Sequence, residues 1–260
     1  MPESHAQNNR VQTILRKGGT AWGTMAFEFF TPGLCETLAA AGADFVFLDM
    51  EHSGVGIETI KAQCLFARGA GIAPFVRVPA CERYLVTSVL DAGAVGIMVP
   101  MVETEQQATA LASWCRYRPA GTRGLAFGVA HDAYRASAPV PAMAAANDAV
   151  MAIPLIESAR GIAAAEAILS VPGIDLGWLG HYDLSDSLGC VGAFDDAGYV
   201  AAEAALRAAA TRTGKPLGWL AADPAAARAA AARGYRCLCL GTDVALLRSA
   251  FADALTTARD

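Results

Sequence analysis

Short apolar runs recur along the chain and alternate with longer stretches rich in alanine and leucine. Several runs, such as 45–48 and 95–99, are apolar at every position rather than at every second one. A strand buried on both faces has this pattern, which is typical of parallel sheets covered by helices. We therefore expect eight strands, at 20–26, 44–49, 74–78, 95–100, 150–157, 175–180, 216–220 and 236–241.

The stretches between these runs have helical patterns, and glycine ends several of them just before the next run, as at 92–94. The expected helices are 34–41, 57–70, 82–92, 103–116, 159–169, 199–211, 224–232 and 244–255. Eight strand–helix units in 260 residues predict one α/β domain over 1–260, a (β/α)8 TIM barrel. An open doubly wound sheet is the alternative.

Residues 119–149 interrupt the alternation of strand and helix patterns, since they contain neither a clear strand nor a long helix. Long insertions in compact domains are usually functional loops. Because this segment comes after the fourth strand, we expect it over the top of the barrel. A surface excursion without a role is the alternative.

Composition narrows the class of protein. Hydrophobic residues make up 54% of the chain, enough for a large core, and charged residues interrupt the apolar runs before a membrane span of about 18 residues can form. Residues 1–17 lack the apolar centre of a secretory signal, so we expect a soluble, cytoplasmic protein without membrane partners. The seven cysteines include no C-x-x-C pair and are expected to be reduced, buried thiols.

The net charge of −5 argues against nucleic acid as a partner, because phosphate binding needs a basic face. A local cationic pocket for a small acid remains open.

Polar side chains collect at the C-terminal ends of the expected strands, where barrel enzymes carry out their chemistry. Such charges are costly next to apolar runs unless they are paired or metal-bound. Glu157 and Asp183 follow consecutive strands and suit an oxygen-bound divalent ion, Mg²⁺ or Mn²⁺ with Co²⁺ as a third candidate. A helix cap is the alternative for Asp183.

Asp49 lies three residues before His52, a spacing at which the carboxylate could orient the imidazole in an acid–base dyad. A structural histidine is the alternative. Arg77, inside the third strand, could anchor a substrate carboxylate and stabilise an enolate oxygen, or pair with Glu51.

The chain contains three lysines, Lys17, Lys61 and Lys215, and none of them is expected at the C-terminal end of a strand. An aldolase that forms a Schiff base needs a lysine at the reacting centre. Carbanion stabilisation would therefore fall to a metal ion.

Six segments, in this order, resemble the HpcH/HpaI aldolase family. They are 48–52 (LDMEH), 76–79 (VRVP), 98–102 (MVPMV), 119–124 (PAGTRG), 156–158 (IES) and 180–185 (GHYDLS). The family consists of metal-dependent class II pyruvate aldolases on a (β/α)8 barrel. Its members are typically hexamers, trimers of dimers, that exchange a C-terminal helix, which here would be 244–255.

The resemblance implies catalytic roles for matched residues. Glu157 and Asp183 match the metal-binding carboxylates of the family. His52 matches its general base, which works through a metal-bound water with Asp49 as partner. Arg77 matches the arginine that contacts the keto oxygen of pyruvate.

It also implies substrate-binding residues. The backbone around Tyr182 and Asp183 matches the loop that holds the pyruvate carboxylate, and Arg123 matches a loop arginine. Leu220 matches an apolar residue that can reach the site of a neighbouring subunit. Leu155, His181 and Met25 depart from the family pattern, so the resemblance does not identify the aldehyde that the pocket accepts.

These observations together predict reversible cleavage of a 4-hydroxy-2-oxo acid to pyruvate, or a close 2-oxo acid, and an aldehyde. A malyl- or citramalyl-CoA lyase and a barrel that binds a keto acid without turnover are the alternatives.

Overall fold

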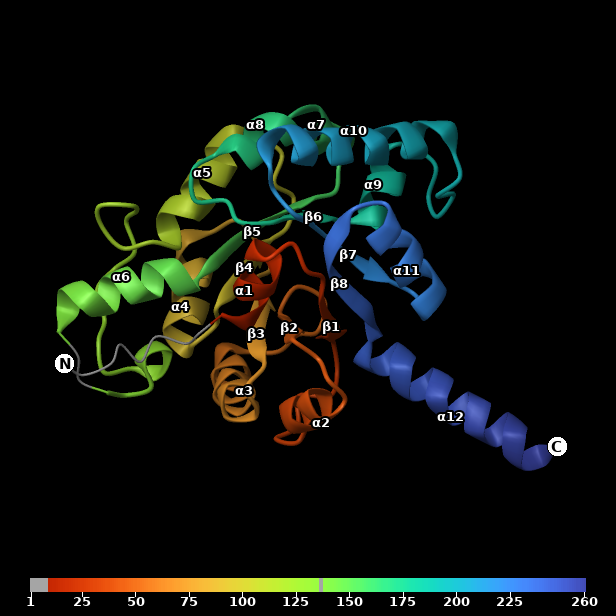
Figure 1. The fold of residues 1–260 in the computed structure, drawn as a ribbon, viewed down its shortest axis with the longest axis horizontal. Helices are drawn as coiled ribbons and strands as arrows, with labels where there is room; N and C mark the ends of the chain where they lie inside the picture. Colours follow the sequence, from red (N-terminus) through yellow and green to blue (C-terminus); the bar gives the residue numbers. More distant parts are fainter. Residues whose placement is uncertain (1–8, 136–137) are drawn as a thin grey trace.

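The computed structural model describes residues 9–135 and 138–260. Each strand pairs in parallel with the next along the chain, and β8 pairs with β1, so the sheet closes into a barrel (Figure 1). The strands are β1 (Ala21–Ala26), β2 (Phe45–Asp49), β3 (Ala73–Arg77), β4 (Gly96–Val99), β5 (Met151–Ile156), β6 (Gly177–Leu179), β7 (Leu217–Ala221) and β8 (Tyr235–Thr242). The expected (β/α)8 TIM barrel is confirmed.

Helices surround this barrel and follow the expected order. They are α2 (Leu34–Ala40), α3 (Ile57–Ala70), α4 (Arg83–Ala92), α5 (Glu105–Trp114), α7 (Ala159–Ala163), α8 (Ala165–Ser170), α10 (Ala197–Thr213), α11 (Pro224–Ala232) and α12 (Asp243–Arg259). The helix expected at 159–169 is therefore two short ones. The sequence patterns did not predict α1 (Arg10–Arg16), η1 (Ala130–Asp132), α6 (Pro139–Ala149) or α9 (His181–Ser187). Within 9–135 and 138–260, no helix has the length and apolar character to cross a membrane.

The described parts of the segment 119–149, residues 119–135 and 138–149, lie at the opposite end of the barrel from the one expected. The segment follows α5 and leads through α6 directly into the first residue of β5, so it joins a helix to the N-terminal end of a strand. Asn9, close to the start of the described chain, donates to the main-chain oxygens of Val95 and Ala149, which precede β4 and β5. The expectation of a loop over the top of the barrel was wrong because a connection after a helix, not after a strand, lies at the bottom.

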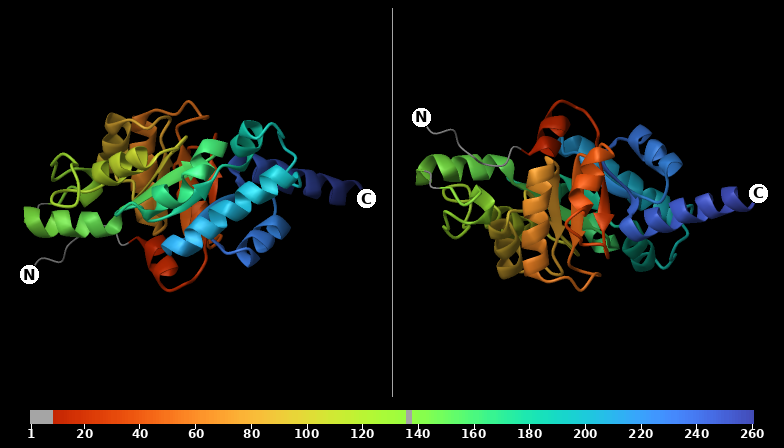
Figure 2. Two further views of the ribbon diagram at one scale, coloured as in Figure 1. Left: turned by 90° about the horizontal axis from the view of Figure 1, so that it is seen from above. Right: turned by 90° about the horizontal axis from the view of Figure 1, so that it is seen from below.

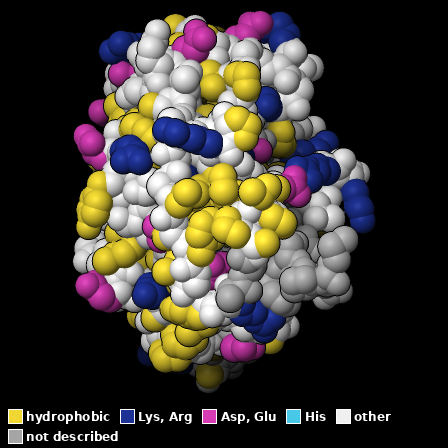
Figure 3. Space-filling view, turned by 90° about the vertical axis from the view of Figure 1, so that its left-hand side faces the viewer, with side chains coloured by type: hydrophobic (Ala, Val, Ile, Leu, Met, Phe, Trp, Pro, Cys, Tyr) yellow, Lys and Arg dark blue, Asp and Glu magenta, His cyan; other side chains and the backbone are white. Residues whose placement is uncertain are grey.

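The side of the molecule that carries α6 exposes several large apolar side chains. Figure 3 shows apolar groups gathered on this face among separate basic and acidic ones. In the segments 83–92 and 119–149 the exposed large apolar residues include Tyr84, Leu125, Tyr134 and Val140.

The barrel interior is filled by every second residue of the strands. Phe45, Phe47 and Phe75 pack with centroid separations of 5.2–5.8 Å, and Trp178 of β6 closes this cluster at 5.0 Å from Phe47. The intervening residues, such as Val46, belong to the second core between the barrel and its helices. Most strands are therefore buried on both faces, as the uniformly apolar runs indicated, whereas Trp219 and Leu220 of β7 are half-buried.

Helix α12 projects away from the barrel, and the views in Figure 2 place it at the opposite end of the molecule from α6. Its first residue, Asp243, is the one buried side chain of the helix. The Asp243 carboxylate accepts the main-chain N–H groups of Phe27, Glu28 and Phe29 at 2.7–3.0 Å. The first residue of α12 thus holds the loop that follows β1, while most of the other side chains of the helix are exposed in the described structure.

The seven cysteines are free thiols. Burial raises the pKa of Cys64 and Cys237, which are completely buried, so these two groups are protonated and unreactive at neutral pH. Five of the seven thiols are buried, whereas Cys81 and Cys190 are half-buried.

Candidate active site

Three polar residues face the barrel interior at the C-terminal end of their strands. In β2 and β3 the inward positions run through Phe45 and Phe47 to Asp49, and through Phe75 to Arg77. Glu157 follows β5 at the next inward position after Leu155. The two-residue period of a strand therefore places the three side chains in one layer, directly above the aromatic cluster.

Asp49 and Arg77 are register partners on neighbouring strands and form a buried ion pair. Arg77 Nε donates to Asp49 Oδ1 at 2.5 Å, and the exposed fractions of the two residues are 8% and 0%. The other carboxylate oxygen of Asp49 accepts the main-chain N–H of His52 at 2.8 Å. Asp49 thus orients both the guanidinium of Arg77 and the loop after β2.

The remaining nitrogens of Arg77 differ in their contacts. Nη1 lies 3.2 Å from Glu51 Oε2, so the pairing with Glu51 considered from the sequence exists. Nη2 is buried and has no hydrogen-bond partner among the described residues. An unpaired buried donor is costly, and such donors in native proteins usually await a ligand, an ion or a water. Arg77 therefore presents one fixed N–H group to an acceptor in the site.

Glu157 is 5% exposed, and its carboxylate is fixed from two sides. The main-chain N–H of Met101, which follows β4, donates to Oε1 at 2.7 Å. Met101 has a φ of 53°, a left-handed conformation that is uncommon for residues other than glycine. On the other side, a Cβ added to Gly180 would lie 2.5 Å from Glu157 Oε2. Glycine at 180 therefore leaves the space that the carboxylate occupies.

Burial raises the pKa of Glu157 to about 7. The hydrogen bond from Met101 and the charge of Arg77 oppose this rise, whereas Asp183 and Glu51 add to it. Burial also raises the pKa of Glu51, and Asp49 and Asp183 act in the same direction. Four carboxylates from three segments thus repel one another, and the charge of Arg77 lowers the pKa values of both Glu157 and Glu51.

Asp183 lies in the first turn of α9 and is exposed. His181 lies two residues before Asp183. Its Nδ1 accepts a hydrogen bond from Trp219 Nε1 at 3.0 Å. Burial lowers the pKa of His181 to about 4, so this imidazole is neutral and carries its proton on Nε2. The Tyr182 ring, 61% exposed, lies 4.7 Å from that of His181.

The imidazole of His52 does not contact Asp49 in the structure. Its side chain is 58% exposed, and Nε2 lies 3.7 Å from Glu51 Oε2. Asp49 already accepts hydrogen bonds from Arg77 and from main-chain N–H groups of Glu51 and His52. The expected side-chain dyad is therefore not formed, because Asp49 binds the backbone of His52 instead of its ring.

The other two residues expected at the site differ in their positions. Leu220 lies in β7 and packs, half-buried, against the core inside the barrel. Arg123 lies elsewhere: its guanidinium pairs with Asp91, the penultimate residue of α4, at 2.8 Å and lies 4.6 Å from the ring centre of Tyr117. The structure does not bring Arg123 to the site, because the segment that carries it lies at the other end of the barrel.

Glu157 and Asp183 suit a divalent cation by their chemistry and charge. A buried carboxyl whose pKa is raised by neighbouring carboxylates gains most from an added positive charge. The described residues contain no group of three or more His, Cys, Asp or Glu side chains arranged to hold a metal. Two carboxylates are sufficient for an ion such as Mg²⁺, which usually keeps several waters and binds through one or two protein carboxylates.

A statistical model of the HpcH/HpaI aldolase/citrate lyase family matches residues 27–250. The chain belongs to this family. It is 34% identical to a hydroxypyruvate/pyruvate aldolase from Roseovarius nubinhibens, over 93% of each chain. A 2-keto-3-deoxy-L-rhamnonate aldolase from Klebsiella pneumoniae is 36% identical over 84% of this chain and 81% of its own. A solved structure of a family protein from Burkholderia cenocepacia superposes with a TM-score of 0.90 at 33% identity, over 97% of this chain and 100% of that one.

Membership in the HpcH/HpaI family agrees with the resemblance noted from the six segments, and the aldolase relatives place the protein among the carbon–carbon lyases. The main-chain N–H of Met101 and the space at Gly180 were not predicted, because a backbone donor and a missing Cβ have no signature in residue type alone. The sequence indicated Glu51 only as an alternative partner of Arg77. Its position next to His52 gave no further signal of a role in the site.

The raised pKa of Glu157 predicts how the stability of the metal-free protein depends on pH. The folded state disfavours the ionised carboxyl, so the free energy of unfolding should fall as pH rises from about 4.5 to about 7 and level off above. The full effect is about 3 kcal/mol. Glu157→Gln should remove most of this dependence and stabilise the protein at pH 8 more than at pH 5, as measured by urea unfolding with EDTA present. Equal changes at both pH values would show that Glu157 ionises normally.

Proposed function

We propose that the protein catalyses the reversible aldol cleavage of a 4-hydroxy-2-oxo acid to pyruvate, or a close 2-oxo acid, and an aldehyde. The observation that carries the proposal is the unpaired, buried Nη2 of Arg77 beside the carboxylates at the C-terminal end of the barrel. A 2-oxo acid offers this donor a keto oxygen, on which negative charge develops when the enolate forms. The names of the aldolase relatives favour this reaction over the carbon–carbon cleavage of a CoA thioester by a malyl- or citramalyl-CoA lyase.

Glu157 and Asp183 would hold a divalent cation, Mg²⁺, Mn²⁺ or Co²⁺, which would act as a Lewis acid on the carboxylate and keto oxygens of the substrate. Met101 and Gly180 support this role, since the Met101 N–H holds the Glu157 carboxylate without neutralising its charge and Gly180 leaves room for it. The exposed position of Asp183 leaves its oxygens accessible to a ligand from solvent.

Arg77 orients the 2-oxo acid. Asp49 and Glu51 hold two of its three guanidinium nitrogens, so the direction of Nη2 is determined before any ligand binds. A donor that is already oriented stabilises developing charge without a further cost of reorganisation. The guanidinium lies over the ring of Phe27, at 5.6 Å from its centre, which restricts water on that side.

His52 is the proposed base. It takes the proton of the C4 hydroxyl, the C3–C4 bond breaks to release the aldehyde, and the bonding electrons stay on the pyruvate fragment as the enolate. Protonation at C3 then gives the 2-oxo acid. The exposed imidazole next to Glu51 supports Glu51, rather than Asp49, as the carboxylate that orients its ring.

The α9 segment would contact the substrate. Main-chain N–H groups around Tyr182 and Asp183, in the first turn of α9, favour a substrate carboxylate. Leu220 supplies apolar surface from β7.

Metal removal tests the proposal. Asp183→Asn should abolish pyruvate release and weaken the binding of Mn²⁺ at least tenfold, more than about 1.4 kcal/mol. Asp186→Asn, an exposed aspartate on the same helix, is the matched control and should leave both unchanged. Pyruvate release is measured by a coupled dehydrogenase assay before and after EDTA treatment. Full activity in the metal-free protein would refute the metal mechanism.

A comparison of two reactions separates the roles of His52 and Arg77. His52→Ala should slow aldol cleavage by roughly 10²–10⁴, the range for a positioned acid–base group. The decarboxylation of oxaloacetate has no hydroxyl proton to remove, so it should be affected much less. Arg77→Lys, which keeps the charge but loses the Nη2 donor, should slow both reactions because both leave charge on the same oxygen.

The rate constants for both reactions are measured at saturating metal for each variant. Equal losses of both reactions in His52→Ala would mean that His52 positions the metal or supports the fold, and the role of base would be withdrawn.

Assembly is the second proposal, and it concerns α12. Val244, Leu246, Leu247 and Phe251 are 40–63% exposed, and the helix extends away from its own barrel (Figure 1). Apolar side chains on a projecting terminal helix gain most when the helix packs on another subunit. We infer a homo-oligomer, a hexamer built as a trimer of dimers, in which α12 docks on a neighbouring copy.

Leu247 and Phe251, four residues apart, lie on the same face of α12. The double substitution Leu247→Asp/Phe251→Asp should therefore give smaller particles, measured by light scattering after size-exclusion chromatography. Ser249→Asp, on the opposite face of the same helix, is the control. An unchanged particle mass in the double variant would contradict the docking of α12.

A further inference from the structure

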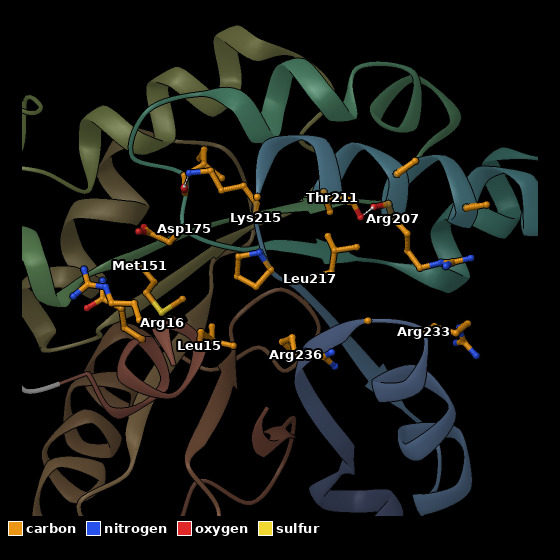
Figure 4. Close-up of a pocket in the computed structure, with 18 residues that line it drawn as sticks. Leu15, Arg16, Met151, Asp175, Arg207, Thr211, Lys215, Leu217, Arg233 and Arg236 are labelled. Carbon is orange, nitrogen blue, oxygen red and sulfur yellow. Dashed lines mark hydrogen bonds between the residues drawn. The ribbon is translucent and has the colours of Figure 1, made fainter. Parts of the chain in front are cut away.

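A cavity of about 860 Å³ opens at the N-terminal end of the barrel, opposite the candidate active site. Its lining comes from the starts of β5, β7 and β8, from the segment before β6, and from α1 and α10 (Figure 4). We refer to it as the basal cavity. Its volume falls in the range of small-molecule sites, about 300–1,000 Å³.

The basal cavity is lined by five cationic side chains, whereas Asp175 is the one carboxylate among the described lining residues. The cations are Arg16, Arg207, Lys215, Arg233 and Arg236. Asp175 is already occupied, because its Oδ2 accepts from Arg116 Nη2 at 2.7 Å and from the main-chain N–H of Ala152 at 2.8 Å. The cavity is therefore electropositive in a chain whose net charge is −5.

Two of these cations lack an acidic partner. Lys215 Nζ donates to the main-chain oxygen of Ile174 at 2.7 Å, and Arg236 Nη1 donates to the main-chain oxygens of Ala231 and Tyr235. Within 9–135 and 138–260, neither group lies within 4.0 Å of a carboxylate oxygen. Main-chain carbonyls hold the two charged groups in place but do not neutralise them.

Of the other three cations, Arg16 pairs with Asp148 at 2.9 Å, whereas Arg207 and Arg233 share one carboxylate. Glu203 lies 3.0 Å from Arg233 Nε and 3.7 Å from Arg207 Nε, so one carboxylate serves two guanidinium groups. Arg207 Nε is buried and makes no hydrogen bond to a described residue. In Figure 4, Arg16 lies at one end of the cavity and Arg207 and Arg233 at the other, with Lys215 and Arg236 between them. Cationic side chains therefore extend along the whole cavity, and the charge in excess of the carboxylate partners lies on Lys215, on Arg236 and on the pair Arg207–Arg233.

Apolar side chains separate the charged ones. They are Leu15, Met151, Ile174, Pro216 and Leu217. A cavity with an apolar floor and several converging cations suits an organic anion better than a simple salt ion, because the carbon body gains from the apolar contact.

We propose that the basal cavity binds a small organic molecule with two or more neighbouring anionic groups, either phosphates or carboxylates. Arginine binds both groups through paired N–H donors, and Lys215 adds a point charge. This site is separate from the proposed aldol chemistry, since its residues lie at the N-terminal ends of the strands whereas Glu157 and Asp183 follow the C-terminal ends.

Calorimetric titration of the EDTA-treated, full-length protein with pyrophosphate and, separately, with citrate tests the proposal at low ionic strength. At least one of the two anions should bind to a single site per chain, with an affinity that falls as NaCl is added. Binding of pyrophosphate alone assigns the site to phosphorylated ligands, and binding of citrate alone assigns it to polycarboxylates. Asp183→Asn should bind as the wild type does, which separates this site from the candidate active site.

Thr211→Glu is the decisive variant. Thr211 is an exposed lining residue on α10 whose hydroxyl bonds only to the main-chain oxygen of Arg207, so glutamate should fold normally and add a negative charge to the cavity. It should weaken binding at least tenfold. Thr109→Glu, an exposed helical threonine on α5, is the control and should bind as the wild type does.

Lys215→Met, which removes one unpaired charge, should weaken the same binding several-fold. Three results would overturn the proposal: no binding of either anion at millimolar concentration, binding that Thr211→Glu leaves unchanged, or binding that Asp183→Asn abolishes.

Discussion

Asp49 and Arg77 face each other across neighbouring strands with almost no exposure to solvent, and the polar end of the barrel is organised around their ion pair. Removing one member of a buried pair leaves an uncompensated charge and typically costs about 3–5 kcal/mol. Both members of the pair also contact the loop after β2: Asp49 accepts the main-chain N–H of His52, and Arg77 contacts Glu51. The loop after β2 and the guanidinium therefore keep a common orientation.

The same region carries an excess of negative charge. Burial, Asp183 and Glu51 all disfavour the ionised form of Glu157, while Met101 supplies a neutral donor rather than a counter-ion. An arrangement that is unfavourable by itself becomes favourable once a cation or a ligand acceptor is present. Proteins commonly retain such local conflicts where they bind.

The sequence predicted the barrel because most strands are buried on both faces and are therefore apolar at nearly every position. It also predicted the layer formed by Asp49, Arg77 and Glu157, because strand ends are visible as the last polar residue of an apolar run. Two errors had a common origin in connectivity. Residues 119–149 and Arg123 were assigned to the top of the barrel by order in the chain, whereas the preceding helix α5 carries them to the bottom. The ring of His52 could not be placed, since its orientation depends on Asp49 already being occupied by other donors.

Asp243 connects the projecting helix α12 to the loop that follows β1. It is the first residue of the projecting α12, and it also binds the main chain of Phe27, whose ring lies over the guanidinium of Arg77. One carboxylate therefore connects the start of α12 to the residue that covers Arg77. Under the proposed docking of α12 on a neighbouring copy, dilution would remove the support of this helix, and the order around Arg77 would then depend on protein concentration.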